Sequence, residues 1–561
     1  MANVFKHFNE EKWNELRTHP YFESYRTSIA KAIDKHSKSD PPYIKFTDIH
    51  RYEVDGDREV FEKVYNEYLH RLNSYFVAYN LFGNEEYLDT IANLIWSICD
   101  FESWSIPAHV PEYRTVAERR QNLDLCSTIV GARIAQILYF IGDKLPELVV
   151  RRAKAEIRYR IIDSFKEAKN ERYWWLTAVN NWPAVCVESI FETYLYMAEK
   201  EEIDEQLPRM IECMDRYISG FAQDGCCSEG HAYWVYGFSY FCIFAELLRE
   251  YTEGKVDYFK NPKIETIARF QEHIILNEKE SVSFSDATIR FVCDTPLTHF
   301  LKDVYPDLNT PATTACTNPA MAVYCILWQK PELAASSIDL SVPMSYKFED
   351  TQWFIYRSAA YSFCCKAGHN DEMHNHNDVG SFMISKGKGV TFCDPGRGRY
   401  SKDYFEEDKR YQILLCSSAG HCVPIINGKC QKNLPNKSKI YVSENERYAF
   451  SMEGVYEDET LESLTRDFVC EKDGVLLTDT FKFSEQPESV VERFVSMYPM
   501  SLGESSIICE ESELLFDKDL YEVSFSSEEV DRHGGKTDIV YWADLKVKNP
   551  QKDMALSFKL V

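Results

Sequence analysis

Apolar residues recur at spacings of three and four along most of the first 330 residues. This spacing places them on one face of a helix, so the pattern predicts a mainly helical N-terminal half. The longest predicted helices cover residues 60–82, 86–98, 125–142, 145–165, 185–198, 203–221 and 233–251. Turn-forming residues separate them and strand-like alternation is scarce. Consecutive helices are therefore expected to form antiparallel hairpins, in a solenoid or in a closed α/α toroid.

The pattern changes near residue 335. Residues 336–343 read as a linker, and short runs of β-branched and aromatic residues then follow one another between turn residues. The predicted strands cover residues 353–357, 361–366, 381–385, 440–442, 475–483, 490–497, 522–525 and 539–544. The sequence therefore predicts an α+β multidomain protein, with a helical domain over residues 1–335 and an antiparallel β-sandwich over residues 345–561. A ligand cleft is expected at the junction of the two domains.

Composition narrows the function classes. The chain of 561 residues exceeds what one hydrophobic core usually fills, and its net charge of -26 argues against a general nucleic-acid binder. The first residues contain no apolar leader region, and no long uninterrupted apolar run suggests a membrane span. We therefore expect a cytoplasmic protein, or a periplasmic or secreted one if a leader was removed. The 18 cysteines show no disulfide-scaffold spacing, so most are expected to be buried thiols.

Histidines and carboxylates gather in one short part of the second domain. Residues 374–378 (HNHND) alternate ionisable side chains with asparagines, so an extended segment would direct the ionisable ones to one face. Asp394 follows an apolar run and enters a Pro-Gly turn, and His421 lies further along the chain. A metal ion bound by His376, Asp394 and His421 would keep one open coordination position, as in zinc sites that contact substrate. The alternative is an ordinary strand with hydrogen-bonded histidines.

Two stretches of the helical half also carry unusual side chains. Residues 173–183 (YWWLTAVNNWP) gather aromatic and amide groups at a helix break, and residues 224–237 (DGCCSEGHAYWVYG) form a glycine-rich loop that runs into a helix. Polar loop tips at one end of a helical barrel are where a site is expected.

Taken together and in this order, these motifs resemble the heparinase II/III family of polysaccharide lyases. The matching motifs are Asn180-Asn181-Trp182, the 224–230 loop that leads to Tyr233, the 374–378 segment, the Asp394-Pro395-Gly396 turn followed by Tyr400, and the His421 segment that ends in Asn427-Gly428. They span residues 173–431. The resemblance implies an α/α toroid followed by an antiparallel β-sandwich, and it implies β-elimination on uronic-acid polysaccharides.

The resemblance also implies roles for individual residues. Removal of the proton next to a uronate carboxylate builds negative charge that positioned donors must stabilise, and the reaction needs a base and an acid. Asn181, or Asn180 beside it, would neutralise the carboxylate. Tyr233 would be the general acid and could also be the base, and His374 would be the general base or stabilise charge.

The metal and the substrate contacts follow from the same resemblance. His376, Asp394 and His421 would bind a divalent metal, Zn²⁺ first and Mn²⁺ second, with no organic cofactor. Further substrate contacts are expected from Asn180, Trp182, Glu229, His231, Tyr236, Arg397 and Arg399. Arginine suits sulfate and carboxylate groups because it makes bidentate contacts. The structural alternatives are helix caps for the asparagines, core packing for the aromatic residues, and solvated turn charges for the arginines.

The expected partner is an anionic uronate polysaccharide or oligosaccharide, and the sequence leaves homo-oligomers open. Two other functions compete with the lyase. A cupin-like metal enzyme also uses His-x-His, but the long helical half and the lack of a Glu shortly after His376 count against it. A non-catalytic carbohydrate-binding protein would keep the cleft, and the presence of Tyr233 and His374 counts against that function.

Overall fold

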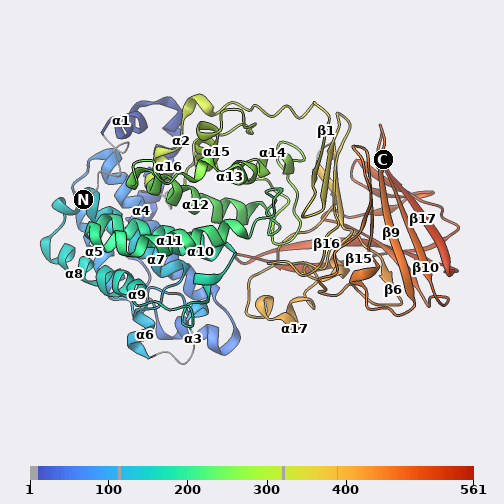
Figure 1. The fold of residues 1–561 in the computed structure, drawn as a ribbon, viewed down its shortest axis with the longest axis horizontal. Coiled ribbons are helices and arrows are strands. Elements are labelled where there is room, and N and C mark those ends of the chain that lie inside the picture. Colours follow the sequence, from blue (N-terminus) through green and yellow to red (C-terminus); the bar gives the residue numbers. More distant parts are fainter. Residues whose placement is uncertain (1–9, 111–114, 319–321, 388) are drawn as a thin grey trace.

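The computed structural model describes residues 10–110, 115–318, 322–387 and 389–561. Helices make up the N-terminal half and β-sheets the C-terminal half (Figure 1). The last short helix of the first half covers Pro331–Leu333, and the first strand, β1, covers Met344–Phe348. The N-terminal residues on which the localisation prediction depends lie largely outside the described residues.

The helical half is built from amphipathic segments whose apolar faces meet. Its α-helices are α1 (Glu10–Thr18), α2 (Glu23–His36), α3 (Phe46–Asp55), α4 (Glu59–Phe82), α5 (Glu86–Cys99), α6 (Val116–Arg120), α7 (Leu125–Ile141), α8 (Glu147–Ile157), α9 (Asp163–Lys166), α10 (Asn181–Met197), α11 (Lys200–Ser219), α12 (His231–Tyr251), α13 (Pro262–Ala268), α14 (Phe270–Ile274), α15 (Thr295–Val304) and α16 (Ala322–Leu327). Helix α10 contacts α7, α11 and α12, so it is buried on nearly every side. The predicted helix over 145–165 is divided by a π-helical turn at Arg158–Ile162.

The segment Leu125–Lys144, which contains α7 and the turn after it, is by length and composition apolar enough to cross a membrane, although polar residues interrupt its apolar run. Most of this segment is buried inside the protein, and α7 packs against α8 and α10. A helix that is apolar on every side is typical of a protein core as well as of a membrane. Its composition is explained by its position in the helical core.

The described residues of the β-half form three antiparallel sheets. Their strands are β2 (Trp353–Arg357), β3 (Ser362–Lys366), β4 (Phe382–Lys386), β5 (Gly389–Phe392), β6 (Ile425–Ile426), β7 (Ile440–Ser443), β8 (Arg447–Ser451), β9 (Leu461–Cys470), β10 (Val475–Phe483), β11 (Val490–Ser496), β12 (Ser501–Leu502), β13 (Ser506–Cys509), β14 (Ser512–Leu515), β15 (Tyr521–Arg532), β16 (Lys536–Val547) and β17 (Asp553–Leu560). The sheet orders are β1-β2-β3-β4-β5, β12-β13-β14-β17-β10-β9-β8-β7 and β15-β16-β11-β6. A short helix, α17 (Glu407–Arg410), lies in the loop after β5.

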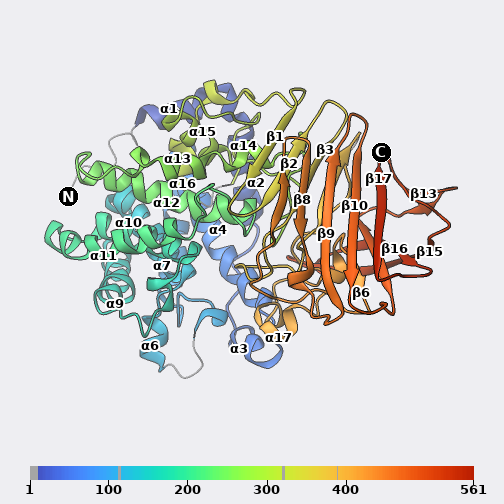
Figure 2. The ribbon, with the colours of Figure 1, turned by 45° about the vertical axis from the view of Figure 1, so that its right-hand side comes forward.

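The first sheet lies between the helices and the rest of the β-half (Figure 2). Successive residues of a strand point to opposite faces. Trp353 and Ile355 accordingly pack in the core shared with the helices, whereas Phe354 between them packs in the core of the sandwich. Burial on both faces explains why β2 and β3 are nearly continuous apolar runs. It also fixes the position of the first sheet against the helical half.

The last long hairpin reaches back to the helical half (Figure 1). Strands β15 and β16 are much longer than the predicted 522–525 and 539–544. Much of β15 is polar and exposed, so the outer part of the hairpin lacks the alternation that predicts a half-buried strand. At its tip, the backbone N–H of Gly534 lies 3.3 Å from Oε1 of Glu59 and donates to it.

Candidate active site

Asn181 begins α10 and faces the junction of the two halves. Asn180 precedes it as the N-cap, and its Oδ1 accepts a hydrogen bond from the backbone N–H of Trp182 at 3.1 Å. Gly237 of α12 permits close packing here, because a Cβ atom on it would lie 3.0 Å from Cβ of Asn181. The Asn181 carboxamide makes no hydrogen bond with the described part of the chain, so it is available to a ligand. Asn180, in contrast, has a structural role as the cap.

Tyr233 and His374 meet across the domain junction. The hydroxyl of Tyr233 lies 3.3 Å from Nδ1 of His374, and the two ring centroids are 4.3 Å apart. The same hydroxyl lies 2.7 Å from the hydroxyl of Tyr400. Burial raises the pKa of Tyr233 well above its usual value, and Tyr400 and Asp286 raise it further. Tyr233 is therefore protonated at neutral pH and can act as an acid.

A cavity of about 400 Å³ opens beside this pair. Its lining comes from both halves of the protein and includes Asn181, Glu229, Tyr233, Thr351, Glu372 and Met373. The structure thus brings the predicted amide and phenol to one cavity, with the predicted imidazole in contact with the phenol.

The 374–378 segment is a loop, so the conditional prediction of a strand is wrong. His374 has a φ of +54°, which lies in the left-handed region and is incompatible with a regular strand. His374 and His376 both contact Asp286, whereas Asp378 contacts Nζ of Lys366 at 2.7 Å. These buried polar contacts determine the backbone conformation of the segment, in place of the alternation of the sequence. Asp378 therefore does not lie with the two histidines.

His376, Asp394 and His421 are fully buried and could hold a metal ion. Their ligand atoms all lie within 4.8 Å of one another. His376 Nδ1, Asp394 Oδ2 and His421 Nδ1 have no hydrogen-bond partner among the described residues, although the last two atoms lie 2.8 Å apart. The other ring nitrogens are engaged, by Asp286 at 3.0 Å from His376 and by the carbonyl of Leu415 at 3.1 Å from His421. This arrangement leaves the inward nitrogens free to bind metal and fits a divalent cation.

Asp286 is the central residue that the sequence analysis missed. It is fully buried in a loop that follows α14. Its carboxylate accepts hydrogen bonds from His374, His376, Tyr400, Tyr404 and Arg410. A single aspartate in a loop has no periodic pattern or motif, so no signal in the sequence distinguishes it.

Three other predicted substrate contacts lie in different surroundings. Oε2 of Glu229 is 3.6 Å from Nε2 of His374, and burial raises the pKa of this carboxyl. His231 is buried among aromatic rings, and burial lowers its pKa to about 4. The Tyr236 ring packs edge-on against Tyr240 one turn further along α12. Glu229 therefore lies at the candidate site, whereas His231 and Tyr236 contact other aromatic rings and do not line the cavity beside Tyr233.

Trp182 lines a second cavity, of about 340 Å³, next to Asn181. Its ring lies 4.9 Å from that of Trp174 and 4.8 Å from that of His109, measured between centroids. Trp174 is 54% exposed. An aromatic pair in which Trp174 is exposed and Trp182 is partly buried is compatible with the expected contact between Trp182 and a sugar ring.

The two predicted arginines differ in their partners. Arg399 lies 3.6 Å from a carboxylate oxygen of Asp57 and 3.5 Å from one of Glu59, so it joins the β-half to the helical half. Arg397 makes no ion pair with a described carboxylate, and its guanidinium lies 5.8 Å from the centre of the Tyr400 ring. Arg397 is the one of this pair that is free to contact an anionic ligand.

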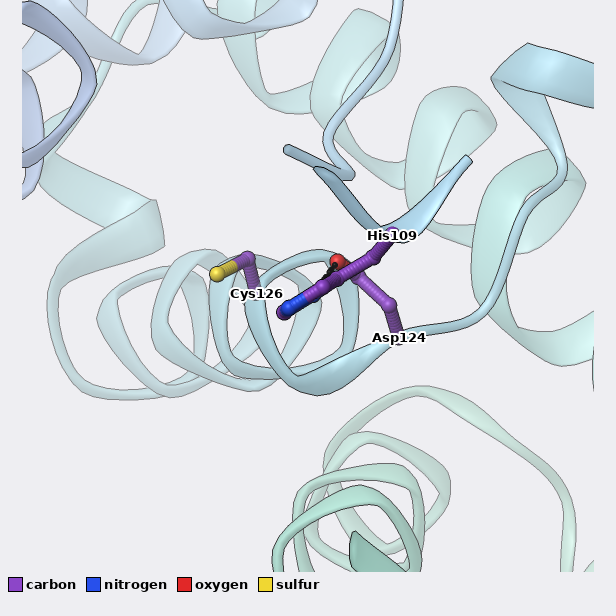
Figure 3. A group of neighbouring side chains, drawn as sticks. All are labelled: His109, Asp124 and Cys126. Carbon is purple, nitrogen blue, oxygen red and sulfur yellow. Dashed lines mark hydrogen bonds and ion pairs between the residues drawn. The ribbon is translucent and has the colours of Figure 1, made fainter. Parts of the chain in front are cut away.

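A second group of potential ligands lies in the helical half (Figure 3). It consists of His109, Asp124 and Cys126. Asp124 caps α7, since its Oδ1 accepts from the backbone N–H of Ser127 at 2.7 Å while its Oδ2 lies 2.9 Å from Nδ1 of His109. The sulfur of Cys126 points away from the carboxylate, and burial raises the pKa of this thiol well above its usual value. The helix cap and the contact with His109 already use the oxygens of Asp124, so a metal would have to displace these hydrogen bonds.

No known protein-family model matches this sequence, and no curated protein matches it. Solved structures do. The crystal structure of Heparinase III superposes with a TM-score of 0.62 at 14% identity, covering 100% of this chain and 92% of that one. The chain has the heparinase III fold.

Other lyases share the fold. The heparan sulfate lyase HepC from Pedobacter heparinus gives a TM-score of 0.55 at 12% identity, with 98% of this chain and 92% of that chain covered. The Streptomyces coelicolor A3 chondroitin AC lyase gives 0.56 at 10% identity, with 98% and 82% covered. The expected resemblance to heparinase-type lyases, with a toroid followed by antiparallel β-sheets, is confirmed at the level of the fold.

Proposed function

We propose that this protein is a polysaccharide lyase that cleaves an anionic, uronate-containing polysaccharide or oligosaccharide by β-elimination. The observation that carries the proposal is the contact between Tyr233 and His374 across the junction, beside a cavity that the uncommitted Asn181 amide also lines. The fold shared with solved polysaccharide lyases supports it.

The three groups have complementary tasks in this reaction. Asn181 donates to the uronate carboxylate and stabilises the negative charge that develops when the neighbouring C–H bond breaks. His374 accepts the C5 proton through Nε2, and the electron pair forms the C4–C5 double bond as the C4–O4 bond breaks. Tyr233 donates its proton to the departing O4. A buried, protonated phenol is suited to this last step.

We propose that His376, Asp394 and His421 hold a divalent metal, Zn²⁺ in preference to Mn²⁺. The support is the convergence of three buried ligand atoms within 4.8 Å of one another, with the outer nitrogens of both histidines engaged. When bound, the metal would compensate the charge of Asp394 and hold the histidine loop against the turn after β5. No organic cofactor is part of the proposal.

Arg397 is the proposed contact for a sulfate or carboxylate group of the substrate. It lies beside Tyr400, which contacts Tyr233, and it has no carboxylate partner among the described residues. A local cationic group can attract an anionic polymer to a protein of net charge -26. Arg399 is not included, because Asp57 and Glu59 already neutralise it.

No observation favours the cupin-like alternative. His374 and His376 lie in the loop between β3 and β4 of an open sheet, instead of inside a small barrel. The binding-protein alternative differs from the lyase only in turnover. Incubation with heparan sulfate, hyaluronan, chondroitin sulfate and alginate, followed by ultraviolet detection of 4,5-unsaturated uronate, separates the two. Absence of the product with every polymer, in the presence of Zn²⁺, would reject the lyase.

The role of Tyr233 has a matched test on the same helix. Tyr233→Phe is expected to lower kcat about 10²- to 10⁴-fold, the usual contribution of general acid catalysis. Tyr251→Phe removes a hydroxyl at the other end of α12, where it donates to Asp204 at 2.6 Å, and should leave kcat unchanged. Equal activity of both variants would show that Tyr233 is not the acid.

A further inference from the structure

We propose that Asp286 is a positioning residue that joins the catalytic imidazole of His374 to the candidate metal ligand His376. This inference rests on the proposed function and adds a residue to it. Each oxygen of the one carboxylate contacts one of the two histidines. The orientation of His374 would thereby depend on the same carboxylate that orients the metal site.

The loop that contains Asp286 packs against residues of both halves of the protein. On one side, a Cβ atom on Gly230 would lie 2.5 Å from Cβ of Ala287. On the other side, a Cβ atom on Gly396 would lie 2.4 Å from the carbonyl oxygen of Ala287. Both glycines also have positive φ, so any other residue would be strained there. These contacts hold Asp286 at one place relative to both domains.

The first oxygen of Asp286, Oδ2, orients the groups proposed to transfer protons. Nδ1 of His374 lies 2.7 Å from it and the hydroxyl of Tyr400 lies 3.2 Å from it. A carboxylate only accepts, so Nδ1 of His374 carries the proton and Nε2 is left as the basic nitrogen. Tyr400 donates to the same oxygen and can accept from Tyr233. One atom therefore orients both the imidazole and the pair of hydroxyl groups.

The second oxygen, Oδ1, orients the candidate metal ligand. Nε2 of His376 lies 3.0 Å from it, and Nδ1 of the same ring lies toward Asp394 and His421. Tyr404 and Arg410 complete the contacts of this oxygen, with Nη2 of Arg410 at 3.3 Å. A carboxylate that holds the outer nitrogen of a metal-binding histidine is a common support for such sites.

The replacement Asp286→Asn tests this bridge. An amide has one acceptor oxygen where the carboxylate has two, so one of the two histidines must lose its acceptor or change its tautomer. We expect kcat and zinc affinity each to fall about 10- to 100-fold, with little change in KM because Asp286 does not contact substrate. Nitrogen-15 NMR of labelled histidine should show a single His374 tautomer in the wild-type protein and a mixture in the variant.

Asp378→Asn is the matched control. Asp378 is equally buried and lies in the histidine loop, but it pairs with Lys366 instead of with the histidines. This variant should unfold at lower denaturant concentration while keeping kcat, zinc affinity and the His374 tautomer. Should Asp286→Asn not fold, Tyr404→Phe removes one donor of Oδ1 and keeps the charge, and a smaller loss of zinc affinity is expected.

The outcomes separate this inference from the proposed function. Unchanged kcat, zinc affinity and tautomer in folded Asp286→Asn would overturn the inference even if the wild-type protein is a lyase. If the wild-type protein cleaves no uronate polymer, the proposed function fails, whereas the tautomer and zinc measurements still decide whether Asp286 joins the two histidines. Equal losses in Asp286→Asn and Asp378→Asn would indicate a general structural role and would also overturn it.

Discussion

Two groups of histidine and aspartate side chains, one in each half of the protein, differ in how many of their polar atoms are already used. In the helical half, His109 and Asp124 satisfy each other and cap a helix. In the β-half, Nδ1 of His376 has no hydrogen bond, and Nδ1 of His421 and Oδ2 of Asp394 pair only with each other among the described residues, at 2.8 Å, although all three side chains are fully buried. A buried nitrogen without a partner is costly, so this convergence favours a ligand. Proximity of residues that can bind metal is by itself a weaker indication of a metal site.

The largest effect is expected for His421→Ala. The replacement removes a proposed metal ligand and leaves the buried carboxylate of Asp394 without its neighbour, which lies 2.8 Å away. Loss of one partner of a buried pair typically costs about 3 to 5 kcal/mol. We expect loss of bound zinc, measured by atomic absorption, together with a lower free energy of unfolding from urea denaturation. A variant that kept its zinc would show that the ligand assignment is wrong.

A smaller effect is expected for Asp124→Ala in the helical half. This replacement removes the cap of α7 and the partner of His109, and loss of an N-cap costs about 0.5 to 2 kcal/mol. Urea denaturation should show this decrease, while the zinc content should be the same as in the wild-type protein. Asp124→Asn keeps an acceptor for the helix and should restore most of the stability. Loss of zinc from the alanine variant would show that the group in the helical half also affects zinc binding, so the two groups would not differ in this respect.

The smallest effect is expected for Cys126→Ser. Burial raises the pKa of the thiol, and its sulfur points away from the carboxylate of Asp124 (Figure 3). The replacement should leave zinc content and kcat unchanged and should alter the free energy of unfolding by less than about 1 kcal/mol. A decrease in zinc content would establish a second metal site in the helical half.

Some residues of the candidate site could be predicted from the sequence, and others could not. Asn181 and Tyr233 were identified by motif, and the structure brings both to one cavity. Tyr236 has the same residue type one turn further along the helix, yet it packs against Tyr240. Arg397 and Arg399 also look equivalent in the sequence, but their partners differ. The direction of a side chain depends on the segments that pack against it, and those lie far away in the chain.

The sequence by itself determined the order of the two architectures and most element positions. Helical and strand periodicities are local properties that follow from which residues lie on one buried face. Only the tertiary structure decided that residues 374–378 form a loop, that β15 and β16 extend beyond their alternating part, and that Asp286 holds both histidines. The hydrogen bonds of Asp286 join residues about 90 positions apart. No local pattern encodes such contacts, because their energy exists only when the chain is folded.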